Sequence, residues 1–561
     1  MRDLRPGLKR FWPLVVGGGL FFIQGFGAAR HDSPTYDEPL HLTSGYVYLK
    51  TGLYWIDASA PPLARIVTAL PLLLLPLEFS RDDPAWMNGR RFAFCAHFLS
   101  HNTVSQDTLF LLARTMVLLL GLLLSWMIWA WAEEAWGETA AAMSLLYFAA
   151  CPPLLAHGHL VTTDFAYTTA FVGVLWGFWR FLRRPEERAS ALLAGIALGA
   201  ALNIKYSAIS IFGILGCLFL MERPWKTGSR TVLLQGLKTI AWTTLLLCLP
   251  FYGFKWRAAL AGISGVGYYS VHGWAGYLLG HFSEKGWPWY FVLVLLLKTP
   301  LVLLVMAWGS LWLVRGVSER RFLSVWILSP AWMILAITSL SRIQVGVRHL
   351  LPIYPLLCMA AGAATAALWQ KHAIGRSCAI AAILGSLFVS VAAYPYYIAY
   401  FGELAGGSSN GYKILADSNC DWGQELKALS VYLKKTTPGP IYLSYFGNID
   451  PADYGIAYEA LHPAVDAPMT RDRMVEAGQP GTVLLAVSAT NRQGLYYKRH
   501  DTFQWLDSLR PVSVLGHTLF VYDITRDARA HREMSRLYAE AGLTDRVNNE
   551  LDWVKRLEAG S

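Results

Sequence analysis

The chain has 561 residues, of which 54% are hydrophobic and 15% charged, and its formal net charge is +10. Soluble domains carry about a quarter charged residues, so this composition excludes an ordinary soluble protein and indicates a polytopic membrane protein. The basic residues lie largely in short loops between apolar runs, which argues against nucleic acid as a partner. The seven cysteines show no spacing typical of a disulfide framework or a zinc site.

Apolar runs that approach the roughly 20 residues of a bilayer-spanning helix recur through the first 400 residues. The first run has no small-residue cleavage site, so we expect a retained helix and not a removed signal peptide. The runs predict about eleven transmembrane helices. We place them near residues 12–29, 109–131, 140–156, 161–181, 190–204, 206–221, 235–254, 289–313, 322–340, 349–370 and 377–399.

Basic residues in short loops set the expected orientation, because cytoplasmic loops are enriched in Lys and Arg. One side of the predicted spans holds Arg2, Arg5, Lys9, Arg10, Arg183, Arg184, Arg188, Arg223, Lys226, Arg230, Arg315, Arg320, Arg321, Lys371 and Arg376. We therefore expect a cytoplasmic N-terminus, and an odd number of spans places the C-terminal region outside. Residues 63–79 are almost long enough to cross but contain Pro71 and Pro76. They predict helices in the outer interface, since a further span would put the later basic loops outside.

The chain divides into three predicted parts. Residues 1–400 form the transmembrane part, and a long external loop at 30–108 belongs to it. Residues 401–525 predict an external α/β domain, and residues 526–561 a helical hairpin weakly similar to one tetratricopeptide unit. Strands are expected at Ile441–Phe446, Val483–Val487, Val512–Leu515 and Leu519–Tyr522, and helices near 423–435, 501–509 and 528–557.

The acidic pair Asp37-Glu38 directly follows the first predicted span. Carboxylates beside a membrane are costly unless they bind or react with something. One of them could take a proton from an acceptor hydroxyl. The alternative is a helix start, because Thr35 and Asp37 precede an apolar pattern and acids favour helix N-termini. The two interpretations are compatible, since a capped helix would hold the pair rigidly.

Further polar residues lie at the predicted external ends of later spans. His157, His159 and Asp164 could bind a ligand or a metal, or could belong to a helix start capped by a neighbouring threonine. Lys205, between two short spans, could bind a phosphate or merely extend its charge to the interface.

Arg342, Arg348 and His349 lie at another predicted external junction. Arginine on the outer side goes against the orientation bias, which favours a phosphate or carboxylate partner. The alternative is a structural ion pair with an acid such as Glu403.

The segment Asp417–Glu425 is dense in polar groups. Asp417, Asn419 and Asp421 suit sugar hydroxyls, and Trp422 could stack on a sugar face. The alternative is a capped start of the helix at 423–435. The chain contains no Walker A loop, Rossmann fingerprint or HExxH motif, so ATP-driven transport and zinc proteolysis are disfavoured.

Four motifs follow one another along the chain: Asp37-Glu38, a long loop with Pro61-Pro62-Leu63, Asp164 and Lys205. The order of these motifs resembles that of the GT-C fold glycosyltransferases of the protein O-mannosyltransferase and aminoarabinose (lipid A) transferase group. The resemblance covers about residues 1–400, and residues 417–424 resemble a segment of bacterial family-39-like transferases. The chain departs from the mannosyltransferases at Ala60, where a histidine often precedes the two prolines, and it lacks their extra domain between later spans.

The resemblance implies inverting transfer of a sugar from a polyprenyl-phosphate donor to an acceptor hydroxyl at the external membrane face. Asp37 is then the general base, and Glu38 orients Asp37 or the acceptor. The implied phosphate-binding residues are Lys205, Arg348 and Arg342. The implied sugar or acceptor contacts are Asp164, His159, His349, Asp417, Asn419, Asp421 and Trp422. No cofactor is expected; a role for a divalent cation and the identities of sugar and acceptor (protein, lipid or glycan) stay open.

Two other functions stay open from the sequence. A lipid-linked sugar flippase or other transporter should show internal repeats or charges near the bilayer midplane, and neither is visible. An assembly protein would act through its external domain and helical tail. In each case we expect a multi-pass protein of the bacterial inner membrane with a periplasmic C-terminal domain.

Overall fold

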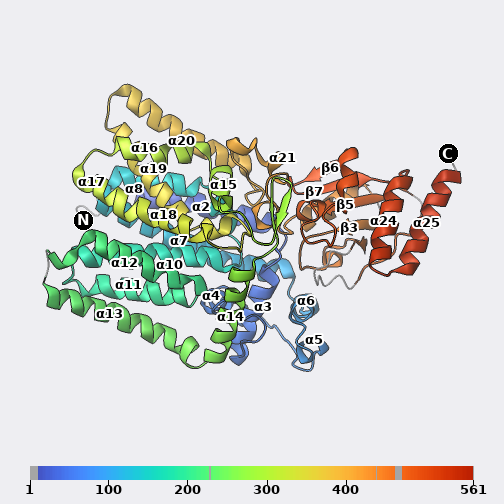
Figure 1. Ribbon diagram of the computed structural model, residues 1–561, viewed down its shortest axis with the longest axis horizontal. Coiled ribbons are helices and arrows are strands. Elements are labelled where there is room, and N and C mark those ends of the chain that lie inside the picture. The colour runs from blue at the N-terminus through green and yellow to red at the C-terminus, as the bar shows by residue number, and fades with distance from the viewer. Residues whose placement is uncertain (1–10, 227–228, 437–438, 462–470, 480, 560–561) are drawn as a thin grey trace, which may run out of the picture.

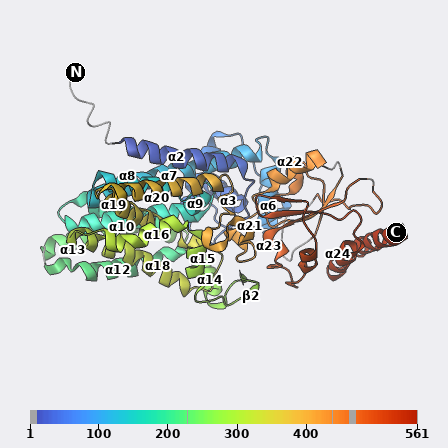
Figure 2. The same ribbon diagram turned by 90° about the horizontal axis from the view of Figure 1, so that it is seen from above.

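The computed structural model describes residues 11–226, 229–436, 439–461, 471–479 and 481–559. A long bundle of helices makes up one end of the molecule, and a smaller domain built around a sheet makes up the other (Figure 1). A helical hairpin lies beyond the sheet, and the view from above shows α2 running along one side of the bundle (Figure 2). The basic residues Arg2, Arg5, Lys9 and Arg10, used above for orientation, lie outside the described residues.

The bundle confirms the predicted polytopic helical architecture. Its helices are α2 (Trp12–His31), α7 (Gln106–Trp136), α8 (Glu138–Ala149), α9 (Pro152–His157), α10 (Thr163–Arg183), α11 (Arg188–Leu202), α12 (Ser210–Glu222), α13 (Arg230–Cys248), α15 (Tyr290–Lys298), α16 (Leu301–Leu313), α17 (Val317–Phe322), α18 (Ser329–Ser339), α19 (Ile353–Trp369) and α20 (Ala373–Ala393). Within the described ranges, five helices are long and apolar enough to cross a membrane, or six if the bent pair α15–α16 counts as one span. The larger number of spans drawn from the sequence stays a prediction.

Prolines break two of the predicted spans. The span expected at 140–156 ends at Ala149 and resumes as α9, whose first two residues are Pro152 and Pro153. The span expected at 289–313 bends by 108° between α15 and α16, with Pro300 at the break. A proline lacks the amide hydrogen that a continuous helix needs and clashes with the preceding turn. Each of these helices is therefore interrupted at a proline.

Small residues let the helices of the bundle approach closely. A Cβ on Gly195 of α11 would lie 2.8 Å from Thr243 of α13, and one on Gly199 would lie 2.8 Å from Leu247. The glycines are four positions apart and so share one face of α11. Close packing of small residues replaces the hydrophobic driving force that helices lack within lipid.

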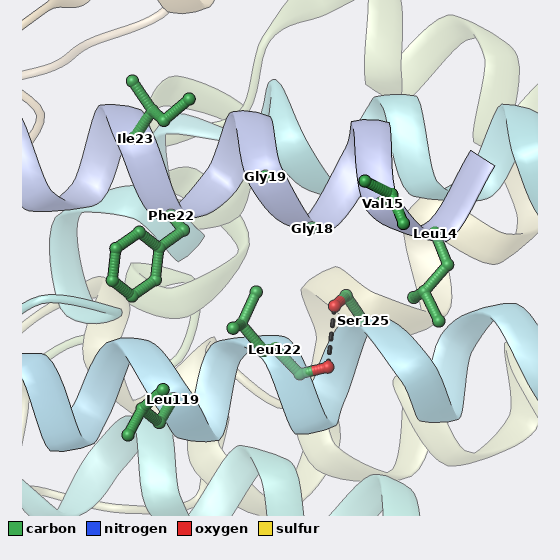
Figure 3. A pocket seen from close by; sticks show the side chains of 9 residues that line it. All are labelled: Leu14, Val15, Gly18, Gly19, Phe22, Ile23, Leu119, Leu122 and Ser125. Atoms are coloured by element: carbon green, nitrogen blue, oxygen red, sulfur yellow. Dashed lines mark hydrogen bonds between the residues drawn. The ribbon is translucent and has the colours of Figure 1, made fainter. Parts of the chain in front are cut away.

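An open apolar groove runs between α2 and α7 (Figure 3). Its volume is about 510 Å³, and its lining residues are Leu14, Val15, Gly18, Gly19, Phe22, Ile23, Leu119, Leu122 and Ser125. The Ser125 hydroxyl donates to the Leu122 carbonyl at 2.8 Å. Because the polar group of the lining is satisfied within its own helix, the groove suits hydrocarbon and offers nothing to a sugar or a phosphate.

The long loop between α2 and α7 folds into short helices beside the sheet domain. They are α3 (Glu38–Thr51), α4 (Leu63–Ala69), a 3₁₀ turn at Leu70–Leu74, α5 (Pro84–Met87) and α6 (Arg91–His101). The helical structure expected within 63–79 therefore forms, and it ends before Pro76. Leu42 and Tyr46 of α3 share one buried cluster with Leu443 of the sheet, so the loop packs against both parts of the protein.

The C-terminal domain contains a five-stranded sheet of order β4-β3-β5-β7-β6. Its strands are β3 (Ile441–Ser444), β4 (Tyr458–Ala460), β5 (Leu484–Ser488), β6 (Ser513–Leu515) and β7 (Leu519–Asp523). β3 is parallel to β4 and β5, whereas β7 is antiparallel to β5 and β6. Four of these strands lie where the sequence places them, and β4 is an additional strand of three residues. Near 501–509 the structure has a 3₁₀ turn at Gln504–Ser508 instead of a regular helix.

The two faces of the sheet are covered by different helices. Ile441 and Leu443 of β3 share a buried cluster with α22 (Leu426–Thr436), whereas Tyr442 between them lies in the cluster that includes the tail. Side chains alternate along a strand, so a single strand serves both faces. The tail consists of α24 (Ala528–Glu540) and α25 (Thr544–Ala559), the hairpin that the sequence predicts.

Buried acids join the tail to the sheet. Glu550 of α25 accepts a hydrogen bond from the Tyr442 hydroxyl at 2.6 Å and lies 2.7 Å from His531 Nδ1 of α24. Glu459 of β4 lies 3.7 Å from Arg546 Nε. Burial raises the pKa of Glu459 to about 7, although a bond from the Val475 amide opposes the rise. The docking of the tail therefore contains a carboxyl group that titrates near neutral pH.

This docking should depend on pH. A raised pKa means that folded Glu459 holds its proton between about 4.5 and about 7 while the unfolded chain releases it. The free energy of unfolding should therefore fall as pH rises through this window, and Glu459→Gln should flatten that fall. Thermal unfolding of the sheet domain at pH 5, 6, 7 and 8 measures it, with exposed Glu476→Gln as the control. Equal pH slopes in wild type and Glu459→Gln would contradict the prediction.

Candidate functional site

The candidate site lies where one end of the helical bundle meets the C-terminal domain. Asp37 occupies the turn between α2 and α3 and directly precedes the first residue of α3. Its Oδ2 accepts a hydrogen bond from Arg348 Nη1 at 2.6 Å. The side chains of Asp37 and Arg348 are 29% and 18% exposed, so solvent and ligands can reach this ion pair. Two residues that the sequence assigns to opposite roles, base and phosphate ligand, therefore meet directly.

Glu38 is fully buried, whereas the neighbouring Asp37 is partly exposed. Arg114 of α7 donates to Glu38 Oε1 from Nε at 2.9 Å and to Oε2 from Nη2 at 2.6 Å. The backbone amides of Thr35 and Val161 donate to the same carboxylate. Burial would raise the pKa of Glu38, but Arg114 and these amides outweigh it and hold the pKa below its ordinary value. Glu38 is thus a fixed anion that locks the turn carrying Asp37.

Arg114 extends this lock to the end of α2. Its Nη1 donates to the carbonyls of Ala29 and Asp32, and its Nη2 to that of Ser33. All five donor hydrogens of a guanidinium can bond in one plane, which suits an arginine to such a corner. Sequence reasoning missed Arg114, although a charge inside the predicted span 109–131 is itself a signal, because it needs a partner in an apolar setting.

A second acid–base pair lies beside the first. Asp164, in the first turn of α10, accepts a hydrogen bond from Lys205 Nζ at 2.5 Å. Lys205 lies between α11 and α12, and its side chain is 20% exposed. Arg348 and His349 act electrostatically on Asp164, so both pairs belong to one charged cluster. Asp37, Asp164, Lys205, Arg348 and half-buried His349 are hence the predicted residues that the structure brings together.

Arg342 does not join this cluster. It is exposed and donates to the Val271 carbonyl at the end of α14 (Trp256–His272). The alternative expectation, an ion pair between Arg342 or Arg348 and Glu403, is not what the structure shows. Glu403 accepts a hydrogen bond from the Leu301 amide, and Arg348 donates to Asp37. The guanidinium of Arg342 therefore bonds outside the cluster, so Arg342 does not act as a phosphate ligand together with Arg348 and Lys205.

Four residues expected to contact sugar lie in the interior instead. His159 is fully buried, with Nε2 at 3.0 Å from Asp32 Oδ2 and Nδ1 at 2.6 Å from the Leu155 carbonyl. Asn419 and Asp421 are buried and bond to the backbone: the former accepts from the Val347 amide and the latter from those of Gly423 and Thr490. Trp422 is 2% exposed, and its ring is covered by the Arg348 guanidinium at 4.7 Å. These are corrections to the expected direct contacts, because a buried side chain with satisfied polar atoms has no face for a ligand.

Asp417 lies between the interior and the cluster. Its backbone adopts a positive φ of 59°, and its carboxylate accepts bonds from the Ser418 amide and the Tyr496 hydroxyl. Burial raises the pKa of Asp417, although the charge of Arg348 opposes the rise. Asp417 thus lies near Arg348, while its carboxylate oxygens bond to neighbouring residues.

Aromatic rings line the side of the site toward the sheet domain. Tyr36, next to Asp37, stacks on Phe446 with ring centres 5.1 Å apart, and Phe446 stacks on Tyr496 at 5.2 Å. Burial and the neighbouring Asp37 raise the pKa of Tyr36 to about 12, so it keeps its hydroxyl proton. The sequence carries no signal for this stack, because its three members come from three distant segments.

A buried ion pair stabilises the loop between α2 and α7. Arg65 Nη2 lies 2.8 Å from Asp57 Oδ2, and Arg65 Nε donates to His41 Nδ1 at 3.1 Å. Both charged side chains are 2% exposed or less. The Pro61-Pro62 step thus precedes α4, whose Arg65 is held by Asp57 and His41 within the loop.

Comparison with known proteins gives the family context. Residues 104–253 match the family model of dolichyl-phosphate-mannose-protein mannosyltransferases. This match confirms the predicted resemblance to the protein O-mannosyltransferase group for that segment, which includes Arg114, Asp164 and Lys205. No curated protein matches the sequence significantly.

Solved structures give weaker likenesses. ArnT from Cupriavidus metallidurans, solved in the apo state and bound to undecaprenyl phosphate, is 15% identical over 91% of this chain and 97% of its own, with a TM-score of 0.46. The Pmt1–Pmt2 protein O-mannosyltransferase complex of S. cerevisiae, bound to its sugar donor, is 16% identical over 46% of this chain and 35% of that one, with a TM-score of 0.34. The oligosaccharyltransferase AglB from Archaeoglobus fulgidus is 13% identical over 77% and 58%, with a TM-score of 0.45.

Proposed function

We propose that this protein is a membrane glycosyltransferase that moves a sugar from a polyprenyl-phosphate donor to an acceptor hydroxyl at the external face of the membrane. The partly exposed Asp37–Arg348 pair carries the proposal, because it places a candidate base beside a phosphate-binding cation. The family match supports the donor class. The described basic loops support a site on the external side, since α17, which carries Arg320 and Arg321, lies at the end of the bundle away from the sheet domain (Figure 1).

The chemistry follows from the two carboxylate–cation pairs. Asp37 takes the proton of the acceptor hydroxyl, and the acceptor oxygen forms a bond to the anomeric carbon. The bond from that carbon to the donor phosphate breaks on the opposite side, so the configuration inverts. The electron pair of the broken bond goes to the phosphate oxygen, where Arg348 and Lys205 stabilise the charge.

The donor phosphate also bears on the ion pair. A lipid phosphate entering the site competes with Asp37 for the Arg348 guanidinium, because phosphate and carboxylate suit the same forked donor. Asp37 is then free to bond to the acceptor hydroxyl, while Glu38 and Arg114 keep its backbone from moving.

Release of free polyprenyl phosphate from polyprenyl-phosphate sugars tests the proposal. The purified protein is incubated with donors that carry mannose, glucose or aminoarabinose, together with an extract of envelope proteins, lipids and glycans as acceptors. We expect acceptor-dependent release with one of these donors. Movement of an intact lipid-linked sugar across vesicles without release would support the flippase alternative, and activity that depends only on residues 526–561 would support the assembly alternative.

Replacing Lys205 with Met should raise the KM for the donor by about tenfold, the factor that corresponds to loss of one charged hydrogen bond. The reason is that Asp164 and the donor phosphate then share a single remaining cation, Arg348. Lys427→Met is the matched control, since Lys427 pairs with Asp107 in the external part without belonging to the cluster. An unchanged donor KM in Lys205→Met would remove Lys205 from the site.

The same assay addresses the cofactor. The leaving group is a lipid monophosphate, whose charge Arg348 and Lys205 can balance, so we propose that transfer needs no bound metal. Turnover should therefore persist after dialysis against a chelator. Loss of turnover that Mg²⁺ or Mn²⁺ restores would instead assign a divalent cation to the reaction.

A further inference from the structure

The segment Asp417–Gln424, here called the junction segment, lies between the two turns that carry Asp37 and Arg348. The sequence suggests sugar recognition for it, yet most of its side chains are buried. It belongs to the part of the chain that follows the last helix of the bundle, α20. Its contacts therefore show how the C-terminal region bears on the chemistry.

One side of the junction segment holds the turn before Asp37. The Tyr36 amide donates to the Trp422 carbonyl at 2.9 Å, and the Ser33 amide donates to the Gln424 carbonyl at 2.9 Å. The Ser33 hydroxyl donates to the Gly423 carbonyl at 3.0 Å. These bonds fix residues 33–36 from outside the bundle, while Glu38 and Arg114 fix the same turn from inside.

The other side of the junction segment holds the turn before Arg348. The Val347 amide donates to Asn419 Oδ1 at 3.1 Å, and the Ser418 hydroxyl donates to the Val345 carbonyl. Gly346 has a φ of 120°, and a Cβ there would lie 2.9 Å from Asn419 Oδ1. The turn can therefore pass this close to Asn419 only with glycine at 346, which indicates a tight and specific fit.

Trp422 then fixes the guanidinium itself. The Arg348 guanidinium lies 4.7 Å from the centre of the Trp422 ring, and His157 packs edge-on against that ring at 6.2 Å. The electron-rich face of an indole ring attracts a cation, so Trp422 restrains the position of the guanidinium. The ring leaves the edge of the guanidinium free to donate to Asp37.

We propose that Asn419 and Trp422 are positioning residues that hold the Arg348 guanidinium in register with Asp37. This inference rests on the proposed function. It makes the C-terminal region part of the catalytic apparatus, because the segment that aligns base and cation comes from outside the bundle. Neither residue touches the sugar; each acts through Arg348.

Four variants test the proposal: Asn419→Ala, Trp422→Leu, Trp422→Phe and the control Asn549→Ala. Asn549 is matched to Asn419, since it also accepts from a backbone amide, that of Ala477, and donates to a backbone carbonyl, that of Val475. It lies in α25, in the helical tail. Hydrogen exchange of the peptide 343–350 and steady-state kinetics with the donor are measured for all four, and thermal unfolding shows the folded fraction.

We expect Asn419→Ala to speed exchange in 343–350 at least about tenfold, because the Val347 amide loses its acceptor. Asn419→Ala and Trp422→Leu should raise the donor KM about tenfold at equal folded fraction. Trp422→Phe keeps an aromatic face and should recover most of the loss. Asn549→Ala should lower the temperature of thermal unfolding without changing exchange in 343–350 or the donor KM.

Unchanged exchange in 343–350 for Asn419→Ala would overturn the inference, and so would an equal donor KM in Trp422→Leu and wild type. A rise in donor KM for Asn549→Ala equal to that for Asn419→Ala would also overturn it, since the effect would then be general loss of stability. If wild type releases no polyprenyl phosphate from any donor while the exchange result holds, the proposed function fails and the positioning contact stands. Binding of undecaprenyl phosphate in detergent then replaces KM as the readout.

Discussion

Asp37→Asn should lower the rate of sugar transfer by about 10²–10⁴-fold, the usual contribution of a general base. The amide is nearly the same size as the carboxylate, so the turn held by Glu38 should stay in place. The amide cannot take the acceptor proton, whereas Arg348 and Lys205 can still bind the donor phosphate. We therefore expect kcat to fall while donor binding stays within a few-fold of wild type.

Steady-state release of polyprenyl phosphate and direct binding of undecaprenyl phosphate separate these two effects. Asp82→Asn is the control, because Asp82 is an exposed acid in the same loop between α2 and α7. Mass spectrometry of envelope glycans, glycolipids and proteins from cells that carry each variant would identify the acceptor. Near-normal turnover by Asp37→Asn would show that Asp37 is not the general base.

Glu38→Gln should have the largest effect on stability. The substitution leaves the Arg114 guanidinium buried without its counter-charge, and breaking a buried pair in this way costs about 3–5 kcal/mol. The pKa of Glu38 lies below its ordinary value, so the carboxylate is charged at neutral pH and the full loss should appear there. The turn carrying Asp37 should loosen as well, and sugar transfer should fall even in the folded fraction.

Thermal unfolding in detergent measures the stability term, with exposed Glu78→Gln as the matched control. The double variant Glu38→Gln with Arg114→Met should recover part of the stability, since it removes the stranded charge. That recovery should not restore transfer, because the bonds from Arg114 to the end of α2 are also lost. A single Glu38→Gln variant as stable as Glu78→Gln would show that the buried pair contributes little.

The sequence predicts the architecture well because hydrophobic runs and loop charges are local signals. It places Asp37 and Arg348 on the same side of the membrane, yet the two are 311 positions apart, and nothing local indicates that they bond. Asp37 and Glu38 are also adjacent and chemically alike, so their residue types alone do not assign different roles to them. Only packing shows that Asp37 faces the site and that Glu38 faces Arg114.

The junction segment shows why polar motifs mislead. Its aspartates, asparagine and tryptophan are the residue types that bind sugars, and they are equally the types that satisfy backbone groups where two domains meet. Burial decides between these uses, and burial depends on the whole fold. The lone arginine at 114 is the opposite case, since its place in an apolar run already indicates a buried partner.

Lys298 has a consequence for the order in which the protein is made. This lysine ends α15 inside an apolar stretch, is 2% exposed, and donates to the carbonyls of Ile398, Tyr400 and Asn419. Its nearest acceptor follows it by 100 residues in the chain. The ribosome must therefore add the whole of α16 to α20 before the charge is satisfied. One of the three acceptors, the Asn419 carbonyl, belongs to the junction segment. Lys298 can therefore complete its bonds only after the ribosome has made the segment that contacts the turns of Asp37 and Arg348.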